Sequence, residues 1–260
     1  IIVLMAGALE LTGCSQGTSN SAKNGTTGSE NTIISESDIA ILDTEDMFTE
    51  RDRDTEYDES ECTAISLSDE ETKCDSDGVK MDGQTVTITE GGTYLLTGSL
   101  SNGSVVVDTD KTEKVQLILE NVSIINEEGA GICVEQADKV FITLADGSTN
   151  KIVSNSFTGN EDTNIDGAIF SREDLTLNGS GTLKITSAAH GIVSKDDLVL
   201  TGGVYQIQSE KQGLSGKESV RIADGTFTIT SGTDAIHSED TDEDTKGFVY
   251  ITGGVLTLAA

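Results

Sequence analysis

The second half of the chain repeats a short pattern of alternating apolar and polar residues. When residues 167–186, 191–208, 213–230 and 235–258 are aligned, the apolar positions fall into columns at a step of 22 or 23 residues, apart from one insertion before Val249. Repetition at a fixed step of this length is typical of solenoids. The five columns are Leu175-Leu198-Val220-Val249, Leu177-Leu200-Ile222-Ile251, Leu183-Tyr205-Phe227-Leu256, Ile185-Ile207-Ile229-Leu258 and Ile169-Ile192-Leu214-Ile236.

Within each unit the pattern predicts about three short strands. Triplets such as Leu175-Thr176-Leu177 alternate apolar and polar residues, which indicates strands with one buried face. Turns such as Gly202-Gly203 and Asp224-Gly225 separate the strands. One unit cannot bury its apolar face alone, but stacking on a similar unit does. The sequence therefore predicts an all-β protein, a right-handed parallel β-helix of about three strands per 22-residue coil. A β-sandwich would not explain columns at constant spacing.

The first half continues the pattern with more variation. Residues 85–88, 105–107, 115–119, 122–125 and 140–144 predict further strands. We interpret residues 47–57 as an N-terminal cap over the edge of the first coil, and residues 155–166 as a projecting polar loop. The pattern stops in mid-repeat at Ala260, so we expect further coils to be missing from the C-terminus.

The start of the chain has the pattern of a bacterial lipoprotein. An apolar run too short to span a bilayer precedes Leu11-Thr12-Gly13-Cys14, which resembles a lipobox. We predict a signal peptide over residues 1–13 that lacks its basic start, lipid attached to Cys14, and a polar tether through residue 45. Residues 46–260 would form the β-helix, held outside the cell on the lipid anchor. A short buried strand is the alternative for the apolar run.

The composition is strongly acidic. The chain has 46 Asp and Glu against 16 Lys and Arg, a formal charge of −30. Such a charge repels nucleic acids and anionic lipid, so we expect neither as a partner, and membrane contact only through the anchor. It suits a monomeric surface protein, or one that binds divalent cations.

The remaining cysteines form no zinc-site spacing. Cys133 lies in an apolar strand and is predicted to be a buried thiol. Cys62 and Cys74 flank a polar stretch, and an extracytoplasmic location would permit a disulfide between them without requiring one.

One turn of the repeat carries acidic residues in successive units. Stacked coils lie about 4.8 Å apart, so these carboxylates would repel one another unless positive charge lies among them. Arg172, Lys195 and Lys217 form an adjacent basic row that could supply it through solvated ion pairs. Calcium, bound by carboxylates from consecutive coils, is the other solution. The candidate ligands are Asp174, Asp196 and Asp197, then Asp166 and Asp240, with Glu173 and Glu218 beside them. A second acidic run, residues 240–244, is interpreted as a charged loop.

Four segments resemble the carbohydrate-binding β-helix family of secreted proteins from clostridia and related bacteria. They are residues 191–198 (GIVSKDDL), their copy at 168–175 (AIFSREDL), residues 92–98 (GTYLLTG) and residues 137–140 (ADKV). The resemblance covers about residues 47–260. It implies right-handed coiling, bound calcium, affinity for acidic plant polysaccharide, and a distant relation to calcium-dependent pectate lyases. The chain departs from the family pattern at His190, Gln212 and Ser219.

The favoured function is binding of pectate-like or other plant polysaccharide through calcium. An outward row of Thr176, Val199, Arg221 and Tyr250 would support an extended glycan, with Arg221, Tyr250, Lys195 and Lys217 as ligand-binding residues. Aromatic residues make up only 4% of the chain, which favours ionic recognition over stacking on cellulose.

Two other classes of function stay open. A calcium-dependent lyase would need a base, for which Lys195 or Lys217 is the candidate; hydrolysis by paired carboxylates has no distinct pair. A surface adhesin or spacer without a sugar ligand is the third. His190 and His237 occupy unrelated columns, so no transition-metal site is predicted.

Overall fold

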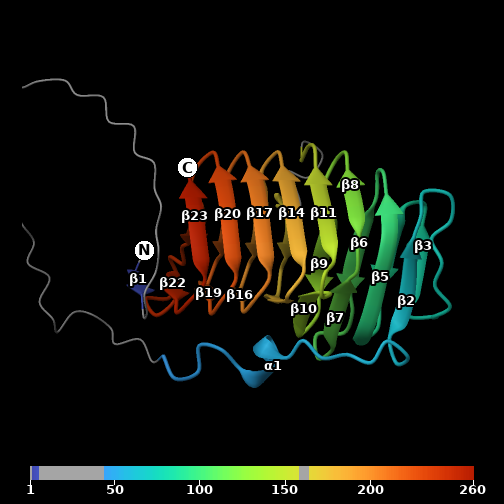
Figure 1. The fold of residues 1–260 in the computed structure, drawn as a ribbon, viewed down its shortest axis with the longest axis horizontal. Helices are drawn as coiled ribbons and strands as arrows, with labels where there is room; N and C mark the ends of the chain where they lie inside the picture. The colour runs from blue at the N-terminus through green and yellow to red at the C-terminus, as the bar shows by residue number, and fades with distance from the viewer. Residues whose placement is uncertain (1, 6–43, 158–163) are drawn as a thin grey trace, which may run out of the picture.

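The computed structural model describes residues 2–5, 44–157 and 164–260, and these residues form a parallel β-helix. Each full coil contributes one strand to each of three faces, which we call sheets A, B and C. Figure 1 shows the coils stacked side by side along the long axis of the molecule. The predicted fold class is confirmed.

Sheet A follows the order β1-β22-β19-β16-β13-β10-β7-β5, and β2 pairs with β5. Its pairs are all parallel. The strand bounds are Ile2–Met5 (β1), Thr63–Leu67 (β2), Gly92–Leu100 (β5), Lys114–Leu119 (β7), Lys139–Leu144 (β10), Asp174–Gly179 (β13), Asp197–Leu200 (β16), Ser219–Ile222 (β19) and Phe248–Ile251 (β22).

Sheet B follows the order β5-β8-β11-β14-β17-β20-β23, since the end of β5 continues into it. Its strands are Ser123–Asn126 (β8), Thr149–Ser154 (β11), Thr182–Ser187 (β14), Val204–Ser209 (β17), Thr226–Ser231 (β20) and Val255–Ala259 (β23).

Sheet C follows the order β21-β18-β15-β12-β9-β6-β4-β3, in which only β3 is antiparallel to its neighbour. Its strands are Val79–Asp82 (β3), Thr85–Ile88 (β4), Ser104–Asp108 (β6), Ile132–Gln136 (β9), Gly167–Ser171 (β12), His190–Ser194 (β15), Leu214–Gly216 (β18) and Ile236–Ser238 (β21).

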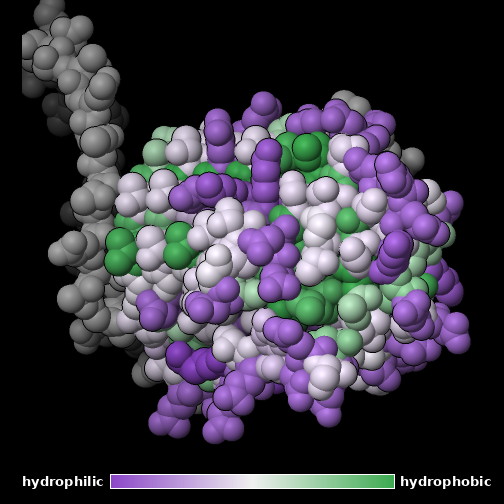
Figure 2. Space-filling model, turned by 45° about the vertical axis from the view of Figure 1, so that its right-hand side comes forward, coloured by the Kyte–Doolittle hydropathy of each residue, from purple (hydrophilic) through white to green (hydrophobic). Residues whose placement is uncertain are grey.

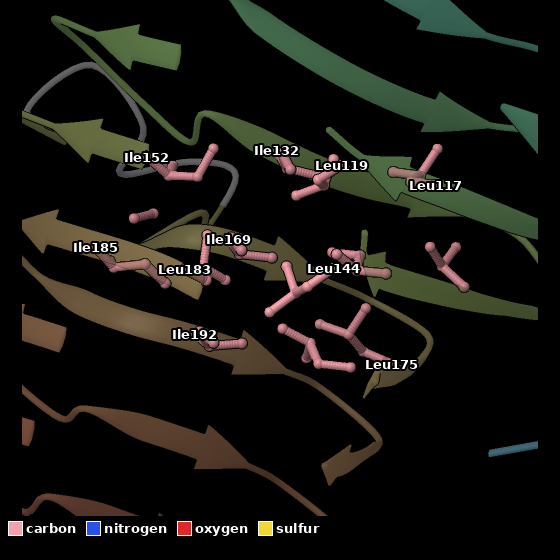
Figure 3. Close-up of a cluster of buried hydrophobic side chains, with 14 of the residues drawn as sticks. Leu117, Leu119, Ile132, Leu144, Ile152, Ile169, Leu175, Leu183, Ile185 and Ile192 are labelled. Carbon is pink, nitrogen blue, oxygen red and sulfur yellow. The ribbon is translucent and has the colours of Figure 1, made fainter. Parts of the chain in front are cut away.

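All five predicted columns are ladders of the core. Leu175 pairs with Leu198, Leu198 with Val220, and Val220 with Val249. The other columns keep the same register. Figure 3 shows Leu117, Leu144 and Leu175 among the side chains that meet inside the coils. Because each side chain stacks on an apolar equivalent from the next coil, a short repeat buries a continuous core. The upstream strands that the sequence predicted are also present.

Glycine enables the turns that the sequence predicted before β17, β20 and β23. Gly203, Gly225 and Gly254 have φ values of 98°, 128° and 95°. Residues that carry a Cβ atom rarely adopt this left-handed backbone conformation, so glycine is favoured at these corners of the coils.

The predicted N-terminal cap lies elsewhere. Residues 47–54, which we call the strap, run across the outer face of sheet A and contain the one-turn helix α1 (Glu50–Arg53). Figure 1 shows this segment below the coils, parallel to the long axis. The prediction that it covers the edge of the first coil is wrong. The hairpin of β3 and β4 and the pairing of β2 with β5 lie there instead.

Three other predictions concern the ends and loops. Ile2–Met5, inside the predicted signal peptide, forms β1 beside β22. Cys14 and the tether through residue 43 lie outside the described residues, as do residues 158–163 of the predicted polar loop. No helix of the described residues is long and apolar enough to cross a membrane.

The structure also sorts the cysteines. Cys62 and Cys74 are free thiols, so the bridge that the sequence permitted does not form. Cys133 is buried, as predicted, and burial raises the pKa of its thiol.

Candidate functional site

The strap covers the row that the sequence assigned to ligand binding. Thr176 and Val199 are completely buried, and Tyr250 is 8% exposed. The ring of Phe48 lies 5.9 Å from that of Tyr250, and Nη1 of Arg221 donates to the carbonyl of Met47 at 3.1 Å. The premise that Arg221 and Tyr250 lie on an open face is therefore wrong, because a segment of the chain itself occupies that face.

A buried ion pair holds the strap. Asp52 is 1% exposed, and its Oδ1 lies 2.8 Å from Nζ of Lys139 and accepts from the Thr176 hydroxyl at 2.7 Å. Burial alone would raise the pKa of Asp52, but its hydrogen bonds with Lys139 and Thr176 outweigh this and lower it to about 2. Asp52 also closes a capping box with Thr49. No pattern in the sequence marks this long-range pair, because residues 52 and 139 meet only in the fold.

The predicted calcium ligands do not gather at one point. Asp197 forms an ion pair with Arg221 and accepts from the Ser219 hydroxyl. Asp174 accepts from the backbone N–H of Asp197 at 3.2 Å. Asp240 lies 3.6 Å from Lys217, and Glu218 lies 2.5 Å from Lys246. Protein cations therefore neutralise much of the corner. Lys217 of the predicted basic row forms one of these ion pairs, and Arg221 and Lys246, which lie outside that row, form the other two.

One part of the corner keeps excess negative charge. Burial, followed by the charges of Glu218, Asp174 and Glu173, raises the pKa of Asp196 to about 6. No three Asp, Glu, His or Cys side chains in the described part of the chain converge closely enough to hold a metal ion. As they are placed, these carboxylates form no coordination shell, and a bound ion would require their side chains to turn.

A groove on the outer face of sheet C brings together polar residues from four coils. Its volume is about 290 Å³. The residues that line it are Asp166, His190, Val193, Ser194, Lys195, Gln212, Ser215, Gly216, Lys217, His237 and Glu239. We call this hollow the sheet C groove. It unites Lys195 and Lys217 with both histidines, which the sequence had treated as unrelated.

Both histidines of the groove lie close to carboxylates, and His190 also accepts a hydrogen bond from the backbone. Nδ1 of His190 accepts from the backbone N–H of Gln212 at 3.2 Å, and its Nε2 lies 3.5 Å from Asp166. Burial lowers the pKa of His190, and the attraction of Asp166 opposes this only in part. His237 lies 3.3 Å from Asp234 and 3.8 Å from Glu239. A neutral His190 carries its proton on Nε2, because Nδ1 accepts from the backbone, and it therefore presents a hydrogen-bond donor on this side of the groove.

The lysines of the groove form only loose ion pairs. Nζ of Lys195 lies 3.7 Å from Asp166, and Nζ of Lys217 lies 3.4 Å from Asp242. Their side chains are 38% and 45% exposed. Such solvated ion pairs contribute little to stability, so a ligand carboxylate could take the place of Asp166 beside Lys195 or of Asp242 beside Lys217. The nearby Asp242 and Asp240 raise the pKa of Lys217, which keeps it protonated and unsuited to act as a base.

Unsatisfied atoms also lie in this groove. Three buried side-chain polar atoms of the described residues lack a hydrogen-bond partner, and two of them, Oδ1 of Asp166 and Nδ1 of His237, line the groove. Buried polar atoms are usually paired, by protein, water or ligand. Sequence reasoning missed the groove, although His190 and Gln212, two of the departures from the family pattern, are among the residues that line it.

The outer face of sheet B is open as well. A hollow of about 330 Å³ is lined by residues of β14, β17 and β20, among them Lys184, Gln206 and Thr228. This face carries mainly uncharged polar side chains. Figure 2 shows that hydrophilic side chains cover much of the surface from another side, with smaller apolar patches between them.

Comparisons with known proteins find a matching family, a relative in sequence and a similar solved structure. A family described as "Carbohydrate-binding domain-containing protein" matches residues 82–260. A relative of the same description from Acetivibrio thermocellus is 42% identical over 188 residues, which cover 71% of this chain and 66% of the relative, just under two thirds of its length. The solved structure of a polysaccharide lyase-like protein from C. thermocellum, a gadolinium derivative, superposes with a TM-score of 0.70 at 35% identity. That match covers 74% of this chain and 80% of the other.

Proposed function

Because the chain belongs to the family of carbohydrate-binding domain-containing proteins, we propose that it binds an acidic, pectate-like polysaccharide in the sheet C groove. One observation carries the proposal. In a chain with a formal charge of −30, Lys195 and Lys217 lie in adjacent coils of an open groove and form only loose ion pairs. Two cations at the coil spacing suit a polymer that presents carboxylates at regular intervals.

The other two faces fit this ligand less well. The strap occupies sheet A. Sheet B is open and also carries two lysines in adjacent coils, Lys151 and Lys184. Mostly uncharged side chains surround the hollow beside Lys184, so this face offers fewer charged contacts to an acidic sugar. The groove therefore combines exposure and concavity with two lysines in adjacent coils on one face.

The experiment is affinity electrophoresis of the protein through gels that contain polygalacturonate or a neutral glucan. We expect polygalacturonate to retard the protein, and the paired variant Lys195→Gln/Lys217→Gln to be retarded much less. The paired variant Lys151→Gln/Lys184→Gln is the control, because it removes the same charge from adjacent coils of sheet B. Equal retardation of both variants would place the contact elsewhere. If no polysaccharide retards the wild type, the binding function is refuted, and a surface adhesin or spacer without a sugar ligand becomes the favoured function.

Calcium is a second part of the proposal. Burial and then the neighbouring negative charges raise the pKa of Asp196, and a divalent cation would offset those charges if Glu173 and Glu218 turned towards it. Calcium should then raise the unfolding temperature of the wild type more than that of Asp196→Asn, in a titration at constant ionic strength. Equal shifts would remove this site. Repeating the electrophoresis with a chelator tests whether calcium takes part in sugar binding.

A lyase remains the second candidate function. The carboxylate of Asp166 lies 3.7 Å from Nζ of Lys195 and 3.5 Å from Nε2 of His190, so a base and a cation flank the same hollow. Incubation with polygalacturonate should yield unsaturated product, detected by its ultraviolet absorbance, if the groove is catalytic. Product in the wild type but none in Asp166→Asn would support this role, and no product from the wild type would exclude it.

We also propose that lipid on Cys14 holds the protein outside the cell, as the residues Leu11-Thr12-Gly13-Cys14 suggest. Expression of the full chain with a labelled fatty acid should label the wild type but not Cys14→Ser. Equal labelling would refute the anchor.

A further inference from the structure

The depth of the sheet C groove comes from one position of the repeat. Phe170 pairs with Val193, Val193 with Ser215, and Ser215 with His237. This outward column therefore runs from a large apolar residue through valine to serine, and then to histidine. The next position is Gly216, which lies between Ser194 and Ser238 in the register. The coil of β18 carries the smallest side chains, so the surface is hollowed there.

Gly216 lies beside the pit and is constrained by the backbone of its own coil. A Cβ atom at this position would lie 2.0 Å from the carbonyl oxygen of Ser219. No other residue can take its place without moving the backbone. Ser215 is different, because its neighbours in the same column carry larger side chains on the same backbone. The pit is therefore a property of the side chain at 215, and a larger residue there would fill it without disturbing the ladder.

The groups around the pit match the groups of a sugar acid. Lys195 and Lys217 occupy equivalent positions, one residue beyond the Ser194–Gly216 pair, and supply positive charge on one side. Asp166 and Glu239 lie at the two ends of the groove, and His190 and Gln212 lie on the other side. A small inorganic anion would meet the carboxylates as well as the lysines. A uronate presents one carboxylate to the lysines and several hydroxyls to Asp166, Glu239 and the histidines.

We propose that Ser215 makes this coil the anchoring subsite, in which one uronate unit of the polysaccharide inserts between Val193 and His237. This inference rests on the proposed function and gives it a location within the groove. Asp166 and His237, each of which has a buried polar atom without a hydrogen-bond partner, then turn towards the bound sugar and form hydrogen bonds with its hydroxyls. Coils about 4.8 Å apart match the length of a pyranose unit in an extended chain, so neighbouring units lie over neighbouring coils.

The test fills the pit without changing its charge. Titration calorimetry with a galacturonate oligosaccharide would compare the wild type with Ser215→Val and Ser215→Phe. We expect affinity to fall with side-chain size, modestly for valine and by about tenfold or more for phenylalanine. Thr228→Phe is the control, because it places the same large side chain on the open face of sheet B.

The outcomes separate this inference from the proposed function. If the wild type binds and Ser215→Phe binds equally well, the subsite is refuted while polysaccharide binding stands. If the wild type binds no oligosaccharide, the proposed function itself fails. Circular dichroism and the unfolding temperature check that each variant is folded. If Ser215→Phe does not fold, Ser215→Val, which reproduces the residue of the preceding coil, decides the question.

Discussion

At the scale of single residues, Asp52 shows how the fold assigns roles that its neighbours in sequence do not suggest. It is one of many acidic residues in a polar stretch, yet its carboxylate is buried against Lys139 and Thr176. A buried carboxylate is tolerated only when charge and hydrogen bonds compensate for its lost hydration. Asp52 satisfies this condition and joins the strap to sheet A.

Removal of this carboxylate should therefore destabilise the protein. Asp52→Ala leaves Lys139 without its partner in a largely buried position and removes the side-chain half of the capping box with Thr49. We expect the free energy of unfolding to fall by about 3 kcal/mol in a urea titration. Asp54→Ala is the control, since the Asp54 side chain is 45% exposed. A loss no larger than that of the control would show that the strap is not held by this pair.

The pKa of Asp52 also predicts a dependence on pH. Its pKa is lowered from the ordinary 3.8 to about 2, so the folded state binds this proton less tightly than the unfolded state does. The contribution of Asp52 is therefore complete above about pH 4 and is lost as the pH falls through about 2. The difference in unfolding free energy between wild type and Asp52→Asn should narrow over this range. A difference that stays constant would contradict the assignment.

At the scale of elements, the coil corner between sheets A and B depends on stacked aromatic rings. Tyr205 of β17 and Phe227 of β20 lie with centroids 4.8 Å apart and planes 6° from parallel. Both are almost completely buried, and the Tyr205 hydroxyl donates to the carbonyl of Gly202. In this column the stack lies between Leu183 of the preceding coil and Leu256 of the following coil.

We expect Phe227→Ala to lower the free energy of unfolding by about 3–5 kcal/mol, because it leaves a cavity between adjacent coils. Thr228→Ala, the next residue on the outward side of β20, should change it by less than about 0.5 kcal/mol. Thermal unfolding of both variants checks this. Similar losses at the two positions would contradict the inward orientation of Phe227.

At the scale of the whole molecule, the charge of −30 opposes compactness. Stacked coils bring like charges from distant parts of the chain together, and after burial the charges of Glu218, Asp174 and Glu173 are what raises the pKa of Asp196. Salt screens such repulsion. We therefore expect the unfolding temperature to rise as sodium chloride increases from low to moderate concentration. A fall over this range would show that the ion pairs outweigh the repulsion.

The sequence by itself determined the fold. Five apolar columns at a constant step require stacking, and the structure places Leu175, Leu198 and Val220 in one ladder. The glycine turns and the buried aromatic residues of the third column were equally local signals. Periodicity carries this information because each coil is held by its immediate neighbours, whose side chains follow the same rule.

Only the tertiary structure decided which faces are open and where the candidate site lies. The path of the strap depends on contacts such as that between Met47 and Arg221, which no periodic pattern encodes. The sheet C groove likewise gathers His190, Ser215 and His237 from three coils. A repeat predicts which residues share a column, but the space above a column depends on side-chain sizes in neighbouring coils and on segments that cross them.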